Sequence, residues 1–306
     1  MAIIDLEHVK KSFGNTNAVN DVSFSVNHGR IFGLLGPNGA GKTTTIRMIN
    51  DILVPDSGHI TIKGQLVGPK TQRYIGYMPE ERGLYKKMRV GEQLLYLSQL
   101  KGLTYGEAKK SIKYWLDRFD AGDWYSKEIN ELSKGMSQKV QFIATIAHDP
   151  DIYIFDEPFS GLDPINSEML KEIIIELRNK GKTILFSTHR MEQVEQMCDD
   201  LCLFNKGKAV LKGELRDIKR SYGKNTINME FRGDAQFLDQ LEDVRINNRS
   251  TNFAEIRVLN GQDEQQILRK ALDHVQIHKF EFVEPSLTEI FISVVGEDNI
   301  NPKELA

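Results

Sequence analysis

The stretch Gly36-Pro37-Asn38-Gly39-Ala40-Gly41-Lys42-Thr43 decides the fold of this chain. It fits the pattern G-x-x-x-x-G-K-[ST], in which glycines let the backbone wrap around phosphate oxygens while successive N–H groups point inward. We expect the Lys42 ammonium to reach the β- and γ-phosphates of a nucleotide and the Thr43 hydroxyl to bind Mg²⁺. Residues 30–35 read as a buried strand before the loop, and residues 44–49 continue a helix that starts near Lys42. An ordinary glycine-rich turn is the alternative, and this context favours the phosphate loop.

Length and composition bound the rest of the chain. Its 306 residues allow two domains, and 40% hydrophobic residues are enough for a packed core. It has no apolar run of the roughly 18 residues that a membrane helix needs, and no basic-then-apolar leader, so we expect neither a span nor a signal peptide. The net charge of −3 gives no reason to expect nucleic acid as a partner. Cys198 and Cys202 lack a second Cys or His pair to complete a metal site, so we expect buried thiols in the reducing cytoplasm.

Residues 1–222 have the pattern of one α/β domain. Short strands are expected to frame the loop with antiparallel structure over 3–9, 19–26 and 58–63. Helical periodicity over 90–119, on two faces, and over 137–147 predicts a helical subdomain at about 90–150. Strands and helices then alternate, which predicts a mostly parallel sheet covered on both faces. The expected elements of this part are strand 152–155, helix 166–180, strand 183–187, helix 190–197, strand 201–204 and, after a hairpin turn at 205–208, strand 209–211.

A second, smaller unit is expected over 223–306. Its elements read as strand 226–232, helix 234–241, strand 244–249, strand 252–259, helix 263–274, strand 276–283 and a closing helix 286–295. This β-α-β-β-α-β order predicts a ferredoxin-like α+β module. It contains no phosphate loop, metal cluster or nucleophile, so a docking or stabilising appendage is favoured over a ligand-sensing domain.

Two carboxylates follow an apolar strand. Asp156 and Glu157 end the run Ile152-Tyr153-Ile154-Phe155, and the carboxyl ends of such strands meet ligands in α/β sheets. We assign Asp156 to the metal opposite Thr43, and Glu157 to the base that accepts a proton from an attacking water. Two charges that merely end a strand are the alternative, which the phosphate loop upstream disfavours.

Three further segments are less specific when taken alone. Ser133 and Gly135 lie at the start of a helix, where a hydroxyl and an N–H suit either a simple helix cap or a second anion site. Asp163 belongs to Ser160-Gly161-Leu162-Asp163, which follows the acidic pair. His189 ends another strand, a place where a lone histidine is usually a surface or core residue.

Taken together, these ordered motifs resemble those of ABC-type ATPases, the nucleotide-binding subunits of ATP-binding-cassette transporters. Gly36–Thr43 is similar to their Walker A motif, Ile152–Glu157 to Walker B with the catalytic glutamate, and 132–136 to the signature. Ser160–Asp163 resembles the D-loop and His189 the switch histidine. Residues 284–291 look like the tail of the sodium-exporter and drug-exporter types.

The resemblance implies a P-loop NTPase (RecA-like) fold with antiparallel β and α-helical subdomains. It implies that Glu157 and His189 are catalytic and that Thr43 and Asp156 hold Mg²⁺. The nucleotide-binding residues that it implies, including an adenine-stacking Phe13, are Phe13, Gly36, Pro37, Asn38, Gly39, Ala40, Gly41, Lys42, Thr43, Thr44, Glu80, Ser133, Gly135 and Asp163.

Two departures from the family pattern stand out. The signature is usually Leu-Ser-Gly-Gly-Gln, whereas Lys134 and Met136 replace a glycine and the glutamine here. Glu80 in Tyr77-Met78-Pro79-Glu80 stands where the family typically has Gln. A glutamate only accepts hydrogen bonds when ionised and repels a γ-phosphate unless a metal lies between them.

The resemblance also implies partners and a location. Two ATPase subunits, most simply two copies of this chain, would hold ATP and Mg²⁺ head to tail and drive export through a separate membrane-embedded permease. The protein would be cytoplasmic, peripheral on the inner face of the cell membrane. A ribosome-associated protein would need a second phosphate loop, and a DNA-repair or chromosome-organising ATPase a long heptad insertion, and both are absent. A regulatory or sensing module with weak hydrolysis remains the alternative.

Overall fold

The computed structural model describes residues 2–81, 83–223, 226–241, 243–259 and 264–296. Their contacts form two compact units, with the division between Gly213 and Glu214. Helix α7 (Leu215–Ser221) therefore belongs to the second unit, whereas the sequence pattern places it in the first. The units are described separately below.

The first unit is built on a six-stranded sheet in the order β10-β9-β3-β8-β7-β6. Neighbouring strands from β9 to β6 are parallel, which confirms the predicted sheet. β3 and β7 are buried at every position because both faces of the sheet are covered. The strands are β3 (Ile31–Leu35), β6 (Ile75–Met78), β7 (Ile152–Asp156), β8 (Thr183–Thr188), β9 (Asp200–Asn205) and β10 (Lys208–Glu214).

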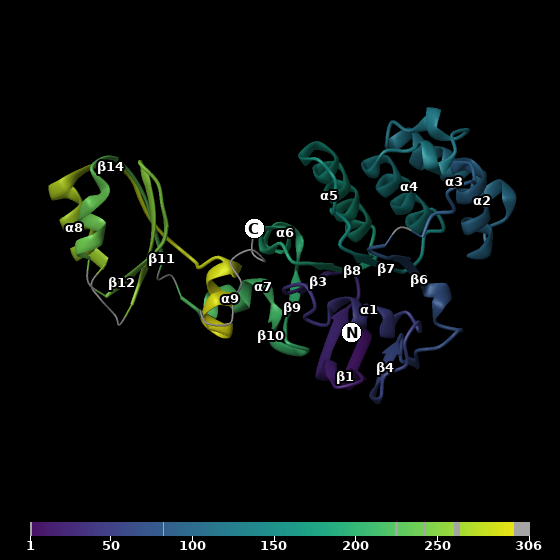
Figure 1. Cartoon of the computed structure of the whole chain (residues 1–306), viewed down its shortest axis with the longest axis horizontal. Helices are drawn as coiled ribbons and strands as arrows, with labels where there is room; N and C mark the ends of the chain where they lie inside the picture. Colours follow the sequence, from purple (N-terminus) through teal and green to yellow (C-terminus); the bar gives the residue numbers. More distant parts are fainter. Residues whose placement is uncertain (1, 82, 224–225, 242, 260–263, 297–306) are drawn as a thin grey trace. The chain divides into compact units, whose positions relative to one another are not determined.

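An antiparallel sheet and the helix after the loop cover one side of this sheet (Figure 1). The antiparallel strands, in the order β2-β1-β4-β5, are β1 (Ala2–Phe13), β2 (Thr16–Asn27), β4 (Ser57–Ile62) and β5 (Gln65–Leu66). Helix α1 (Lys42–Ile49) packs between the two sheets, where Ile46, Met48 and Ile49 are fully buried. The opposite side carries α5 (Pro164–Asn179) and α6 (Met191–Met197) (Figure 1).

The helical subdomain begins after β6 and returns to the sheet at β7. The periodic stretch 90–119 forms two helices rather than one, because Thr104 starts the second with a capping box to Glu107. Its α-helices are α2 (Val90–Leu100), α3 (Tyr105–Arg118) and α4 (Lys134–Ile146).

The second unit has the ferredoxin-like strand order β12-β13-β11-β14. The predicted helix at 234–241 is a 3₁₀ helix, Ala235–Gln240, capped by Asp234, whose Oδ1 accepts a hydrogen bond from the N–H of Gln236. Residue 263 of the other expected helix lies outside the described residues. The remaining elements are β11 (Thr226–Gly233), β12 (Val244–Arg249), β13 (Phe253–Val258), α8 (Glu264–His274), β14 (Val275–Val283) and α9 (Leu287–Val295).

Candidate functional site

The loop between β3 and α1 is closed tightly against neighbouring backbone. Gly41 has a φ of 109°, and a Cβ there would lie 2.4 Å from the carbonyl oxygen of Ala18. At Gly36, with a φ of 148°, a Cβ would lie 2.3 Å from the carbonyl oxygen of Phe204. Both positions need glycine for conformation and for space. The loop backbone is therefore as tightly curved as a loop must be whose N–H groups bind an anion.

Lys42 lies at the bottom of the loop. Its ammonium donates hydrogen bonds to the carbonyl oxygens of Gly36 (2.6 Å) and Pro37 (3.1 Å). Burial lowers the pKa of Lys42, and the carboxylates of Glu157 and Asp156 act in the opposite direction. The cation is thus held by neutral oxygens of its own loop, which a phosphate can outcompete.

Asp156 ends β7 with its side chain fully buried. Its Oδ1 accepts hydrogen bonds from the hydroxyls of Thr43 (3.3 Å) and Ser187. Its Oδ2 is buried and has no hydrogen-bond partner in the described part of the chain. A free carboxylate oxygen beside a threonine hydroxyl is a donor set that fits a hard divalent cation.

Glu157 is held in an unusual backbone conformation. Its φ is 51°, a left-handed conformation that costs a non-glycine residue about 1–3 kcal/mol. Its N–H donates to the carbonyl and hydroxyl oxygens of Ser187, each at 3.2 Å. Its Oε1 lies 2.9 Å from Nδ1 of His189. Burial raises the pKa of Glu157, although the hydrogen bond from His189 and the charge of Lys42 oppose the rise. A carboxylate of this kind suits proton transfer near neutral pH.

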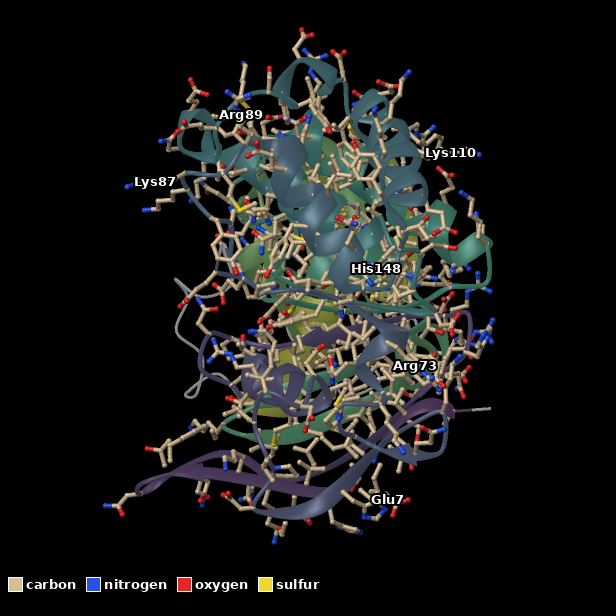
Figure 2. All side chains as sticks on the ribbon, turned by 90° about the vertical axis from the view of Figure 1, so that its right-hand side faces the viewer. Glu7, Arg73, Lys87, Arg89, Lys110 and His148 are labelled. Carbon is tan, nitrogen blue, oxygen red and sulfur yellow. The ribbon has the colours of Figure 1, made fainter. Side chains whose placement is uncertain are left out.

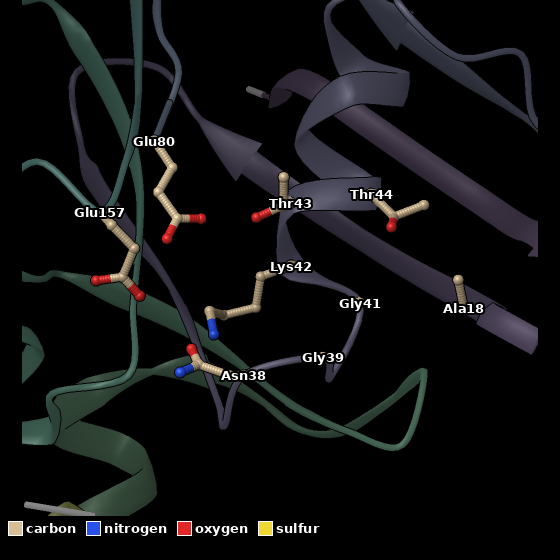
Figure 3. Close-up of a pocket in the computed structure, with 9 residues that line it drawn as sticks. All are labelled: Ala18, Asn38, Gly39, Gly41, Lys42, Thr43, Thr44, Glu80 and Glu157. Carbon is tan, nitrogen blue, oxygen red and sulfur yellow. The ribbon is translucent and has the colours of Figure 1, made fainter. Parts of the chain in front are cut away.

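These groups surround a cavity of about 240 Å³ (Figure 3). Among the predicted site residues, the structure brings to its walls Asn38, Gly39, Gly41, Lys42, Thr43, Thr44, Glu80 and Glu157. Ala40 is buried behind the loop, where its carbonyl accepts from the N–H of Gly207. A second cavity of about 170 Å³ shares Glu157 and is also lined by His189 and by Ser160–Leu162. Of the predicted catalytic pair, Glu157 therefore lines both cavities and His189 lines the second.

Outside the loop and the end of β7, four predicted residues line neither of these two cavities: Phe13, Ser133, Gly135 and Asp163. Ser133 caps α4, where its hydroxyl accepts from the N–H of Met136, and Gly135 lies in the first turn of that helix. Asp163 caps α5. Phe13 ends β1 with 51% of its surface exposed. In a single copy, all four lie outside the wall of the cavity.

Sequence reasoning missed Ser187 and Ala18. Ser187 bonds both carboxylate residues because it is paired with Asp156 in the parallel register of β7 and β8. The sequence shows a hydroxyl near the end of the strand that contains Ser187, but only the strand order shows that Ser187 lies beside Asp156. The Ala18 side chain lines the cavity, and its carbonyl limits the loop at Gly41. Ala18 carries no signal of its own.

A groove of about 700 Å³ lies between the sheet and the helical subdomain. Arg73 and His148, labelled in Figure 2, belong to its lining, and burial lowers the pKa of His148 to about 4. Five buried polar atoms of lining residues have no hydrogen-bond partner in the described part of the chain: Asn50 Oδ1, Gln72 Nε2, Gln141 Oε1 and both ring nitrogens of His148. Ile52 and Leu100 in its lining are exposed. Such a mixture is typical of a surface that a partner covers.

Comparison with known proteins decides the family. The sequence pattern of the ABC transporter family matches residues 19–160, and that of the DrrA1-3-like ATP-binding protein C-terminal domain matches residues 213–295. An uncharacterized ABC transporter ATP-binding protein of Bacillus subtilis (strain 168) is 46% identical over 294 residues, covering 96% of this chain and 99% of the relative. The chain belongs to the family of ABC transporter ATP-binding proteins.

Other comparisons agree with this ABC ATPase assignment. The linearmycin resistance ATP-binding protein LnrL of the same organism is 30% identical and covers 96% of this chain and 98% of its own length. A solved ATP-binding subunit of an ABC transporter superposes with a TM-score of 0.68 at 35% identity, over 72% of this chain and 93% of its own. The ADP conformation of another ATP-binding cassette gives 0.63 at 26% identity, over 71% and 92%.

The predicted P-loop NTPase fold, nucleotide binding and ATP hydrolysis are thereby confirmed: the chain is the ATPase subunit of a transporter. None of the helices in the described residues has the length and apolarity to cross a bilayer. Cys198 and Cys202 are free and buried, as predicted.

Proposed function

We propose that two copies of this ABC ATPase clasp two Mg-ATP molecules head to tail, and that their closing and opening drives export through a separate permease. One observation carries the proposal. The loop, Asp156 and Glu157 surround one side of a cavity, whereas Ser133 and Gly135 lie at a helix N-terminus outside it. A second copy turned by half a rotation offers that helix N-terminus, with its N–H groups, to the γ-phosphate.

Within one copy, the residues have separate tasks. Lys42 exchanges the carbonyls of Gly36 and Pro37 for the β- and γ-phosphates. Thr43 and Asp156 would hold Mg²⁺, which would supply positive charge to the phosphates.

Glu157 is the proposed base. Its raised pKa lets the carboxylate accept a proton from the attacking water and hold it, while His189 keeps the carboxylate oriented through the bond at Oε1. ATP favours the closed dimer because only that state gains the contacts from the second copy, and hydrolysis removes them.

The permease is proposed to place a cytoplasmic segment in the groove between the sheet and the helical subdomain. Its exposed Ile52 and Leu100 and the unpartnered Gln141 oxygen suit a segment with both apolar and polar side chains. The subunit would then lie at the cytoplasmic face of the membrane. Export rather than import is suggested by relatives named for linearmycin resistance and Nod factor export.

The test uses the full chain and Glu157→Gln. The wild type should release phosphate from Mg-ATP at a steady rate, and the variant should not. At saturating Mg-ATP the variant should elute as a dimer in size-exclusion chromatography with light scattering. Adding Lys42→Ala to it should restore the monomer. A Glu157→Gln protein that binds ATP yet stays monomeric would contradict the two-copy arrangement.

A further inference from the structure

Glu80 adds a third carboxylate to the nucleotide cavity. It follows β6 and lines the cavity with Lys42, Thr43 and Glu157. In Figure 3 its carboxylate points into the space between those three side chains. The side chain is exposed and has no hydrogen-bond or ion-pair partner in the described part of the chain.

The charges around the cavity do not balance. Lys42 is the cation among the described lining residues, whereas Glu80 and Glu157 line the cavity and Asp156 borders it at Thr43. All three carboxylates raise the pKa of Lys42 against the larger effect of burial, so all three fields reach the ammonium. A metal-free triphosphate, itself strongly anionic, therefore enters a cavity with an excess of negative charge.

The three carboxylates differ in what holds them. Asp156 accepts hydrogen bonds from Thr43 and Ser187, and Glu157 is bonded to His189. The backbone just before Glu80 is held by a hydrogen bond, because Nε2 of Gln141 donates to the carbonyl oxygen of Pro79 (2.8 Å). The Glu80 carboxylate itself has no such hydrogen bond in the described part of the chain. It thus faces an incoming nucleotide without a hydrogen bond from these residues.

We infer that Glu80 makes the cavity selective for metal-bound nucleotide by repelling the γ-phosphate of metal-free ATP. With Mg²⁺ on the phosphates, the same carboxylate faces a largely neutralised group and the penalty disappears. This inference deepens the proposed function and rests on it for the identity of the ligand. It concerns binding to a single copy, and so it is independent of dimer formation.

The experiment measures binding, not turnover. The fluorescent analogue mant-ATP is titrated into the full chain in excess EDTA and in excess MgCl₂, at protein concentrations that keep it monomeric. Glu80→Gln should tighten binding in EDTA by about tenfold. This factor lies between the one expected for repulsion of two close unit charges in water and the one expected for the same charges near a protein surface. Its dissociation constant in MgCl₂ should change by less than about threefold. Glu80→Asp should retain the wild-type preference for the metal complex.

Glu81→Gln is the matched control, because it removes the same charge from the next residue. The Glu81 side chain is exposed and does not line the cavity. The variant should leave both dissociation constants unchanged. Equal binding in EDTA by the wild type and Glu80→Gln would overturn the inference, as would an equal gain from Glu81→Gln. A wild type that binds no mant-ATP in MgCl₂ would instead refute the nucleotide site itself, so the two failures are distinguishable.

Discussion

Replacing Gly41 by alanine tests whether the loop is closed as tightly as its geometry indicates. Two costs are expected. A φ of 109° is unfavourable for alanine, at about 1–2 kcal/mol. The new Cβ would also lie 2.4 Å from the Ala18 carbonyl oxygen, and the backbone shift that relieves this contact costs about 1–3 kcal/mol. The free energy of unfolding of the first unit should therefore fall by about 2–5 kcal/mol.

Gly39→Ala provides the matched control in the same loop. Gly39 also has a positive φ, 76°, but a Cβ there meets no heavy atom within 4 Å. Only the conformational cost applies, so this variant should lose about 1–2 kcal/mol. The difference of about 2 kcal/mol corresponds to a gap of roughly 6 °C in Tm for a unit of this size.

The assay is urea unfolding of the nucleotide-free protein, repeated with saturating Mg-ATP. ATP should stabilise the wild type by mass action and Gly41→Ala much less, because Gly41 and Ala18 both line the cavity. If the two alanine variants lose equal stability, the contact with Ala18 does not restrict the loop and the reasoning is wrong.

Two further predictions concern Glu157 and the segment after it. Because burial raises the pKa of Glu157 above its ordinary 4.5, the folded state binds the proton more tightly than the unfolded state. This stabilising contribution of the Glu157 proton is complete below pH 4.5 and is lost as the pH rises through the raised pKa. In thermal melts, Glu157→Gln should therefore have a higher Tm than the wild type only at pH values above the raised pKa. A difference in Tm that is independent of pH would contradict a buried charge at Glu157. Gly161→Ala places a Cβ 2.8 Å from Cε of Lys134, but this is the flexible end of an exposed side chain that can move aside. Only the conformational cost of alanine at a φ of 74° is then expected, about 1–2 kcal/mol in urea unfolding, and it should be the same in a Lys134→Ala background. A clearly smaller cost in that background would show that Lys134 resists the new Cβ.

The elements that carry the nucleotide cavity could be predicted because their signals are local. A glycine-rich loop between an apolar strand and a helix, and an apolar strand that ends in two carboxylates, each lie within about ten residues of sequence. Boundaries were less certain where a cap decides them. Thr104 with Glu107 divides the stretch 90–119 into two helices.

Features that depend on strand pairing could not be predicted. Ser187 contacts Asp156 and Glu157 only because β8 lies beside β7, and the left-handed backbone of Glu157 is stabilised by those same contacts. The roles of Ser133, Gly135, Phe13 and Asp163 remain predictions, because the residues that they would meet belong to nucleotide or to a second copy.

Helix α4 connects the parts of the site that lie apart in one copy. Its first residue follows Ser133, which caps the helix and does not line the copy's own cavity. One turn further along, Nε2 of Gln138 donates to the carbonyl of Pro158 (3.0 Å), directly after Glu157. Nε2 of Gln141 donates to the carbonyl of Pro79, directly before Glu80, and Gln141 also lines the groove proposed for the permease.

A movement of α4 must therefore either carry these two hydrogen bonds with it or break them. If the bonds are kept, the backbone next to Glu157 and Glu80 shifts with the helix. If they break, the carbonyl groups of Pro158 and Pro79 lose their hydrogen-bond partners, at about 1–3 kcal/mol each. If a second copy meets Ser133 and a permease segment meets Gln141, as proposed above, both would act on a helix that is hydrogen-bonded to the backbone next to Glu157 and Glu80.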